Sequence, residues 1–240
     1  YFRNFLRLPE VKGTSLALGS AVHSTIEFIL KANGLPEDIE IKKFILLSLQ
    51  KEGVHQKSDI AQLGKDAHTA VKNWIDGYYN ILAKDYTSER SLSYRDKRFP
   101  NLSMYGKVDL TERIGANITV TDFKTGSSKT SGVIEKLDNE GRLSSYMRQL
   151  AMYAYLIDGV EGVMADQLRL LFLEEDSKNK NKLYSTHITG EQIDLLIRDI
   201  TDYQTWLTDG TWVERPCQAK LYGGGVCEYC TRMERIMGKQ

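Results

Sequence analysis

The chain has 240 residues, of which 41% are hydrophobic, and it carries 32 basic and 32 acidic residues. This length fits one large domain, or one domain with a helical extension, and allows an ample core. Because the formal net charge is zero, any nucleic-acid surface has to be a local basic patch. The three cysteines are too few for a disulfide framework.

No apolar run approaches membrane-spanning length, so no membrane association is expected. The first residues, YFRNFLRLPE, lack the layout of a signal peptide. We therefore expect a cytoplasmic protein. The chain starts without a methionine and in the middle of an aromatic and basic run, which predicts a piece cut from a longer chain.

The first third of the chain is predicted to be helical. Residues 16–32, 36–51 and 58–82 carry apolar side chains at helical spacing. His23 lies on the inward stripe of the first of these helices. Taken alone, an inward histidine is more often a hydrogen-bonded core residue than a metal ligand.

A β-hairpin is predicted farther along, from strand-like runs at 105–112 and 118–124 separated by the turn formers Gly115 and Asn117. If Arg113 pairs with Ile118, a four-residue loop remains. Asp109 then lies across from Asp122, with Cβ atoms roughly 5 Å apart.

Two neighbouring carboxylates repel each other unless one is protonated or a cation lies between them. A hard divalent cation such as Mg²⁺ satisfies Asp109 and Asp122 together. Lys124 would add an ammonium group beside them, where it could steady an attacking water or the charge on a phosphate. The alternative is that Asp109 and Asp122 are edge-strand charges paired with Lys124.

The remaining segments complete an α/β pattern. Strands are expected at 91–99, 166–174 and 182–188, and helices at 144–158 and 191–207. Gln149 and Tyr153 form an i, i+4 pair on the first of these helices, which is either ordinary helix surface or part of a site. Together the elements predict a sheet covered by helices.

Three cysteines in the last part of the chain, Cys217, Cys227 and Cys230, include a CxxC pair with metal-ligand spacing. A fourth ligand is absent from this chain, so reduced structural cysteines are a serious alternative.

Four segments in order resemble the motifs of the RecB-type branch of the PD-(D/E)XK nuclease superfamily. They are GSAVHSTIE at 19–27, GKVD at 106–109, TDFKTG at 121–126 and QLAMY at 149–153. The resemblance implies a restriction-endonuclease-like mixed central sheet flanked by helices. Residues 1–86 would be its helical part, 87–210 the nuclease core and 211–240 a cysteine-containing tail, all in one structural unit.

The resemblance also implies a site. His23, Asp109, Asp122 and the backbone carbonyl of Phe123 would hold Mg²⁺ or Mn²⁺. Lys124 would activate the attacking water, while Gln149 and Tyr153 would hold the DNA or the lysine. Glu89, expected just ahead of the first strand, resembles an acidic residue that many relatives place there.

Many relatives also bind an iron–sulfur cluster through an early cysteine and a late CxxCx₅C. Here position 236 is Ile236 and no early cysteine is present. Cys217, Cys227 and Cys230 therefore leave a cluster, a zinc ion or no metal as alternatives, and we expect no intact cluster.

The implied function is a metal-dependent deoxyribonuclease, most simply an exonuclease. The resemblance further implies a covalently linked or associated helicase, a role in DNA repair and a location near the nucleoid. Two alternatives are a stand-alone nuclease of the CRISPR-adaptation type and a catalytically silent DNA-binding module.

Overall fold

The computed structural model describes residues 13–32, 34–174, 182–211 and 235. The chain divides into two compact units, Lys12–Asp199 and a smaller one that includes Ile200–Gln240. All elements that position the candidate site belong to the larger unit. In the described part of the chain, no helix is both long enough and apolar enough to cross a membrane.

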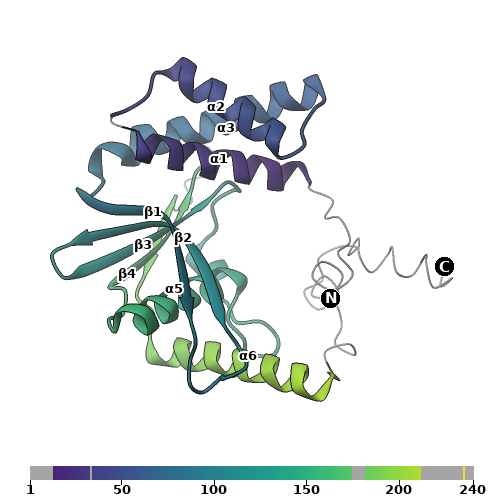
Figure 1. Ribbon diagram of the computed structural model, residues 1–240, viewed down its shortest axis with the longest axis vertical. Helices are drawn as coiled ribbons and strands as arrows, with labels where there is room; N and C mark the ends of the chain where they lie inside the picture. Colours follow the sequence, from purple (N-terminus) through teal and green to yellow (C-terminus); the bar gives the residue numbers. More distant parts are fainter. Residues whose placement is uncertain (1–12, 33, 175–181, 212–234, 236–240) are drawn as a thin grey trace. The chain divides into compact units, whose positions relative to one another are not determined.

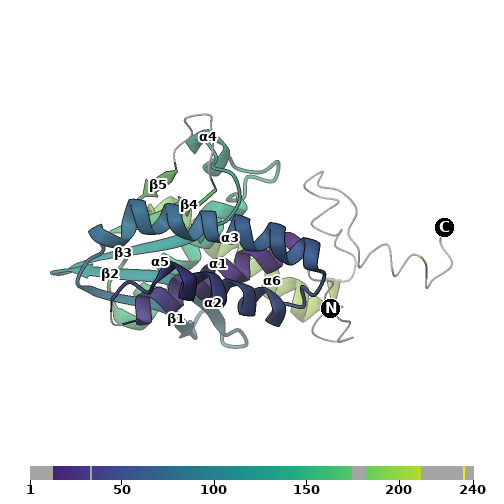
Figure 2. The same cartoon turned by 90° about the horizontal axis from the view of Figure 1, so that it is seen from above.

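Three helices cover one face of the larger unit's sheet (Figures 1 and 2). They are α1 (Thr14–Lys31), α2 (Asp38–Lys51) and α3 (Lys57–Tyr78), and a short 3₁₀ helix, η1 (Tyr79–Ile81), follows. The N-terminus of α2 is fixed by a capping box, in which Glu37 and Glu40 each bind the other's backbone N–H group. Trp74 of α3 is fully buried among the three helices and the sheet.

The sheet has five strands in the order β1-β2-β3-β4-β5. Their bounds are β1 Asp85–Tyr94, β2 Met104–Ile114, β3 Asn117–Lys124, β4 Gln167–Phe172 and β5 Leu183–Thr186. Among the described strands, only the β3–β4 pair is parallel. The remaining helices are α4 (Ser131–Ile134), α5 (Ser145–Glu161) and α6 (Gly190–Asp209), of which α6 spans the boundary between the two units. The mixed sheet flanked by helices confirms the predicted fold class.

The crossover from β3 to its parallel partner β4 contains α5, which lies on the opposite face of the sheet from α1 (Figure 1). Ser144 caps α5 by accepting a hydrogen bond from the Met147 backbone at 3.1 Å. Gly162 ends the helix in the left-handed conformation, with φ 71°.

The hairpin has the predicted register, because Arg113 pairs with Ile118. Its loop is shorter than the predicted four residues. Ile114 and Asn117 also pair, so only Gly115 and Ala116 remain between the strands. Two-residue loops are favoured in hairpins because their twist matches that of the strands.

The first strand was predicted at 91–99, whereas β1 begins at Asp85 and ends at Tyr94. Its first half is polar and half-exposed, which hides the strand pattern in the sequence. One consequence is that Glu89 lies within β1 and not ahead of it.

The side-chain alternation of β1 reverses at Glu89. Tyr86 and Tyr94 are eight residues apart, so regular alternation would place both on one face. Instead, the Tyr86 hydroxyl donates to the Leu30 carbonyl of α1 at 2.8 Å. The Tyr94 ring packs against Tyr155 of α5, with centroids 5.6 Å apart. Glu89 lies between them with φ 53°, a backbone conformation found at no other non-glycine residue in the described part.

Gly106 of β2 faces α5 at close range. A Cβ atom at this position would lie 2.7 Å from Cδ1 of Leu156, a fully buried side chain. Val108, Asp109 and Leu110 are then all buried. Leu110 packs with the α1–α3 helices, so β2 changes face at the same level as β1.

We expect Gly106→Ala to destabilise the protein by about 1–3 kcal/mol, because the added methyl group overpacks a filled core. Gly77 on α3 is the matched control, since a Cβ atom there meets nothing within 4 Å. Gly77→Ala should stabilise by roughly 0.5–1 kcal/mol. Urea unfolding followed by circular dichroism measures both changes, and equal stability of the two variants would contradict this packing.

Candidate active site

Three acidic residues occupy consecutive positions across β1, β2 and β3. The pairs Ser88–Leu110 and Arg90–Val108 place Glu89 opposite Asp109. The β2–β3 ladder ends at Leu110 and Thr121, so Asp109 and Asp122 are the next opposed positions. We call Glu89, Asp109 and Asp122 the carboxylate row.

The carboxylate row lines a cleft of about 640 Å³ between α1, the sheet and α5. The cleft is also lined by the other side chains that the sequence predicts for the site: His23, Phe123, Lys124, Gln149 and Tyr153. The structure thus brings together residues separated by up to 130 positions. The cysteines Cys217, Cys227 and Cys230 lie outside the described residues.

Asp109 is fixed from two sides where the ladder stops. Its Oδ2 accepts a hydrogen bond from the Phe123 backbone N–H at 2.7 Å. Its Oδ1 lies 3.1 Å from Nδ1 of His23, on α1. Burial by itself lowers the pKa of His23, but the hydrogen bond and charge of Asp109, with Asp122 and Glu89, outweigh burial and raise it.

Asp122 is almost fully buried, at 2% exposed. Its Oδ1 is within hydrogen-bond distance of the Gln149 amide nitrogen, at 2.7 Å, and of the Tyr153 hydroxyl, at 3.1 Å. Its Oδ2 forms an ion pair with Lys124 Nζ at 2.8 Å but has no well-aligned hydrogen bond. Burial, together with the nearby charge of Asp109, raises the pKa of Asp122 to about 6.

Gln149 connects the acid and the lysine. Its Nε2 group donates to Asp122 and, at 2.9 Å, to the Tyr153 hydroxyl. Its Oε1 accepts from Lys124 Nζ at 2.6 Å. The opposite amide orientation would place two oxygens against each other, so these contacts determine the orientation. Burial and the neighbouring carboxylates Asp122 and Asp109 raise the pKa of Tyr153 far above its ordinary value, so this hydroxyl stays a donor.

A metal-ligating group is present among the described residues. His23, Glu89 and Asp109 each offer one ligand atom, and these three atoms lie within 4.8 Å of one another. Two carboxylates and an imidazole suit a divalent cation such as Mn²⁺. The buried Oδ2 atom of Asp122, without an aligned donor, is a further oxygen at the same cleft. The residues therefore fit a divalent metal.

Glu89 holds a more central place than the sequence indicates. It forms an ion pair with Lys107 of β2 and belongs to the group that could hold a metal, whereas Asp122 does not. The oxygens of Asp122 are instead directed to Gln149, Tyr153 and Lys124. The acidic side chain of Glu89 was a signal in the sequence, but recognising it as part of the site required the correct start of β1.

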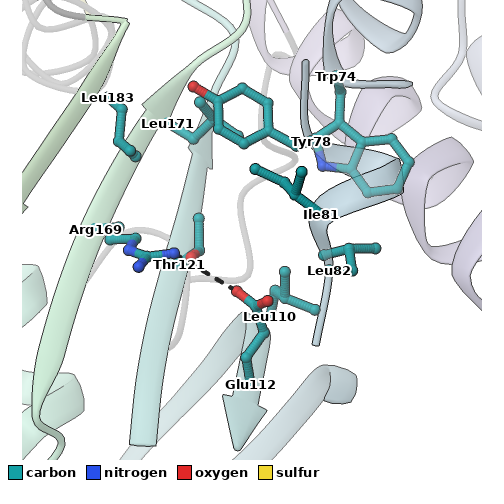
Figure 3. Close-up of a pocket in the computed structure, with 10 residues that line it drawn as sticks. All are labelled: Trp74, Tyr78, Ile81, Leu82, Leu110, Glu112, Thr121, Arg169, Leu171 and Leu183. Carbon is teal, nitrogen blue, oxygen red and sulfur yellow. Dashed lines mark ion pairs between the residues drawn. The ribbon is translucent and has the colours of Figure 1, made fainter. Parts of the chain in front are cut away.

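A second cavity lies on the face of the sheet that α1, α2 and α3 cover (Figure 3). At about 40 Å³ it is far smaller than ordinary ligand sites. Arg169 and Glu112 face each other in it at 3.9 Å, and Glu112 accepts the Ala83 backbone N–H at 3.0 Å. None of the predicted site residues lines this cavity, and its charged groups have structural partners.

The model of a family described as the PD-(D/E)XK nuclease superfamily matches residues 1–235. No curated protein matches the chain.

Solved structures with a similar fold include a "Putative exonuclease" from Eubacterium rectale. The two chains are 15% identical, and the match covers 87% of this chain and 73% of that chain with a TM-score of 0.56. At this identity the match shows a shared fold. A weaker likeness is the protein SSO0001, which is 15% identical; the match covers 86% of this chain and 82% of that chain, with a TM-score of 0.35. Another is VC1899 from Vibrio cholerae, which is 11% identical; the match covers 80% of this chain and 51% of that chain, with a TM-score of 0.27.

We expect the raised pKa of Asp122 to make stability depend on pH. Between the unfolded value near 4 and the folded value of about 6, the folded state binds more protons than the unfolded state. The free energy of unfolding in EDTA should therefore fall as the pH rises from 4 to 6, on the order of 1–3 kcal/mol.

Asp122→Asn removes this titration and should flatten that part of the profile. Urea unfolding at pH 4, 5, 6 and 7 measures the difference. The raised pKa of His23 acts above pH 6.5 and leaves this window unaffected. Superimposable profiles of wild type and Asp122→Asn would refute a buried, proton-binding Asp122.

Proposed function

We propose, since the chain belongs to the PD-(D/E)XK nuclease superfamily, that it hydrolyses phosphodiester bonds in DNA with the help of Mg²⁺ or Mn²⁺. The observation that supports this most is the convergence of Asp109, Asp122 and Lys124 in one cleft. These residues come from two strands and would have no reason to bury adjacent charges for stability alone.

In this proposal His23, Glu89 and Asp109 hold the divalent cation, and Asp122 with the Phe123 carbonyl completes the set. When bound, such a cation stabilises negative charge on a phosphate oxygen and lowers the pKa of a coordinated water. The positive charge of the bound cation would also favour the ionised form of Asp122, whereas burial favours the protonated form.

Lys124 is the residue that we expect to orient the attacking water. Its ammonium group lies between Asp122 Oδ2 and Gln149 Oε1, at 2.8 and 2.6 Å, and one of its three hydrogens remains for a water or a phosphate oxygen. In this proposal Gln149 positions Asp122 and Lys124, and Tyr153 positions Asp122.

The finer parts of the proposal come from the motifs. An exonuclease mode, a linked or associated helicase, a repair role near the nucleoid and a domain division at residues 86 and 210 follow from the resemblance. A stand-alone nuclease of the CRISPR-adaptation type is the main alternative. A silent DNA-binding module is disfavoured, because all the charged groups of the cleft are present and partnered.

We expect the purified protein to cleave labelled DNA in Mg²⁺ or Mn²⁺ and to lose this activity in EDTA. Asp122→Ala and Lys124→Ala should lower kcat by at least about 100-fold, because each removes a preorganised charge from the site. Asp76→Ala and Lys72→Ala are matched controls, since both residues are exposed on α3 and do not line the cleft.

Gel analysis of 5′- and 3′-labelled single- and double-stranded substrates measures the rate and distinguishes end-directed from internal cleavage. Activity that survives EDTA, or that persists in Asp122→Ala, would refute the mechanism. Binding without cleavage in either metal would favour the silent module.

Metal binding can be measured without activity. Ligand that binds only the folded state stabilises it, by about 2.7 kcal/mol at 100 times Kd, so saturating Mn²⁺ should raise Tm by several degrees. We expect His23→Ala and Asp109→Asn to lose most of this increase. His68→Ala is a matched control, because His68 also faces an aspartate, Asp38 at 2.6 Å, outside the metal-ligating group. An equal increase in Asp109→Asn and wild type would contradict this ligand set.

A further inference from the structure

β1 and β2 extend beyond the rest of the sheet as a two-stranded arm. The β1–β2 ladder runs to Tyr94 and Met104, whereas the β2–β3 ladder ends at Leu110 and Thr121. We call residues 90–108 the β1–β2 arm. Figure 1 shows this pair of strands running past α5. The arm begins at the carboxylate row, so its strands lead directly into the cleft.

The back of the arm is packed on α5. Arg90 forms an ion pair with Glu161, and the Tyr94 ring contacts Tyr155. A side chain at Gly106 would collide with Leu156. These three arm residues are even-numbered, as are the buried Leu92 and Met104, so the even-numbered side of the paired strands is the packed side.

The front of the arm consists of the odd-numbered strand residues Ser91, Ser93, Tyr105 and Lys107, all of which are exposed. Arg95 follows β1 and Ser103 precedes β2, and both are also exposed. Tyr105 is 64% exposed and lies within 3.1 Å of the Ser91 hydroxyl. Lys107 is half exposed and forms an ion pair with Glu89. The front therefore leads along the paired strands from the carboxylate row to Ser93 and Tyr105.

The arm is basic in a chain with no net charge. Residues 90–108 include five basic side chains, Arg90, Arg95, Lys97, Arg98 and Lys107, and one acidic side chain, Asp96. Asp96 is 5% exposed and forms an ion pair with Arg98 at 2.6 Å. It also accepts a hydrogen bond from Tyr155. Arg98 thus neutralises Asp96, and Arg90 and Lys107 are likewise paired with Glu161 and Glu89. The positive charge that the arm presents to solvent is therefore carried by Arg95 and Lys97, both of which are exposed.

We propose that the front of the β1–β2 arm is the track along which single-stranded DNA reaches the carboxylate row. This inference rests on the proposed nuclease function. An exposed aromatic ring interleaved with basic residues is the arrangement that binds single strands, because unpaired bases stack on the ring while phosphates contact the cations. Tyr105 stacks on a base, and Lys107 and Arg95 contact phosphates on either side of it.

The dimensions of the arm set the length of strand that it holds. Tyr105 is four residues from Asp109 along β2, roughly 13 Å at the rise of a β-strand. The stacked base therefore lies up to about four nucleotides from the scissile phosphate, at 3.4 Å per nucleotide of stacked strand. A substrate of one or two nucleotides would fill the cleft without reaching Tyr105.

The test compares long and short substrates in Tyr105→Ala, with Tyr105→Trp as the conservative replacement. The probes are a fluorescein-labelled 20-nucleotide thymidine oligomer and bis(p-nitrophenyl) phosphate, both in Mn²⁺. We expect Tyr105→Ala to raise KM for the oligomer on the order of tenfold, with kcat and hydrolysis of the small ester unchanged. Tyr105→Trp should retain the wild-type KM. Tyr203→Ala is the matched control, because Tyr203 of α6 is also exposed, at 52%.

Arg95→Ala tests the phosphate contact separately. Loss of one contact should reduce the slope of log Kd against log salt by about 0.7 for the oligomer, measured by fluorescence anisotropy in Ca²⁺. Lys43→Ala, at an exposed position on α2, should leave the slope unchanged.

The outcomes separate this inference from the proposed function. If the wild type cleaves the oligomer and Tyr105→Ala has an unchanged KM, or if Tyr105→Ala weakens blunt duplex binding as strongly as oligomer binding, the track is wrong and the nuclease proposal stands. If the wild type cleaves neither probe, the nuclease proposal fails. The anisotropy of Tyr105→Ala then still decides whether the arm binds single strands.

Discussion

The mutual repulsion of three carboxylates in one cleft is the constraint around which the larger unit is arranged. Neighbouring strands lie less than 5 Å apart, so the charges of Glu89, Asp109 and Asp122 interact strongly, the more so because Asp109 and Asp122 are buried. Each is offset by groups from a different element. α1 supplies His23 to Asp109, and β2 supplies Lys107 to Glu89. For Asp122 the partners are Lys124 of β3 and two side chains of α5. Side chains from the helices on both faces of the sheet therefore meet the strand residues at the cleft.

The same place is where the backbone departs from regular geometry. A positive φ at a non-glycine residue costs on the order of 1–3 kcal/mol and persists only where the surroundings fix it. At Glu89 this conformation lets β1 pack on α1 through Tyr86 and on α5 through Tyr94. The strained residue thus serves the fold and the site together.

The sequence predicted those parts of the site that follow from local rules. The register of the hairpin comes from its turn formers and strand period, so Asp109 and Asp122 could be placed opposite each other without coordinates. The helical spacing of Gln149 and Tyr153 likewise put both on one side of α5, where they bind Asp122. Loop length was less accessible, because the turn formers Gly115 and Asn117 do not by themselves decide which of their neighbours pair.

Glu89 could not be placed from the sequence, for a physical reason. The segment Asp85–Arg90 lacks an alternating apolar pattern, since it is an edge strand with few buried side chains. A positive φ leaves no trace in a non-glycine residue type. The strand was consequently predicted six residues late, and the acidic residue opposite Asp109 was placed outside it. Tertiary pairing with β2 decides this position, and pairing over twenty residues is not contained in any local period.

The charges of the cleft and of the arm have opposite signs, and this has a consequence for the proposed reaction. A phosphate that follows the basic front of the arm through Lys107 next meets the carboxylate row, where without a cation it is repelled. A divalent ion held by the row removes that barrier. Affinity for the strand and affinity for the ion would then increase each other by the same factor, as thermodynamic linkage requires. The separation of charge along one pair of strands would thus restrict phosphate entry to the metal-loaded site.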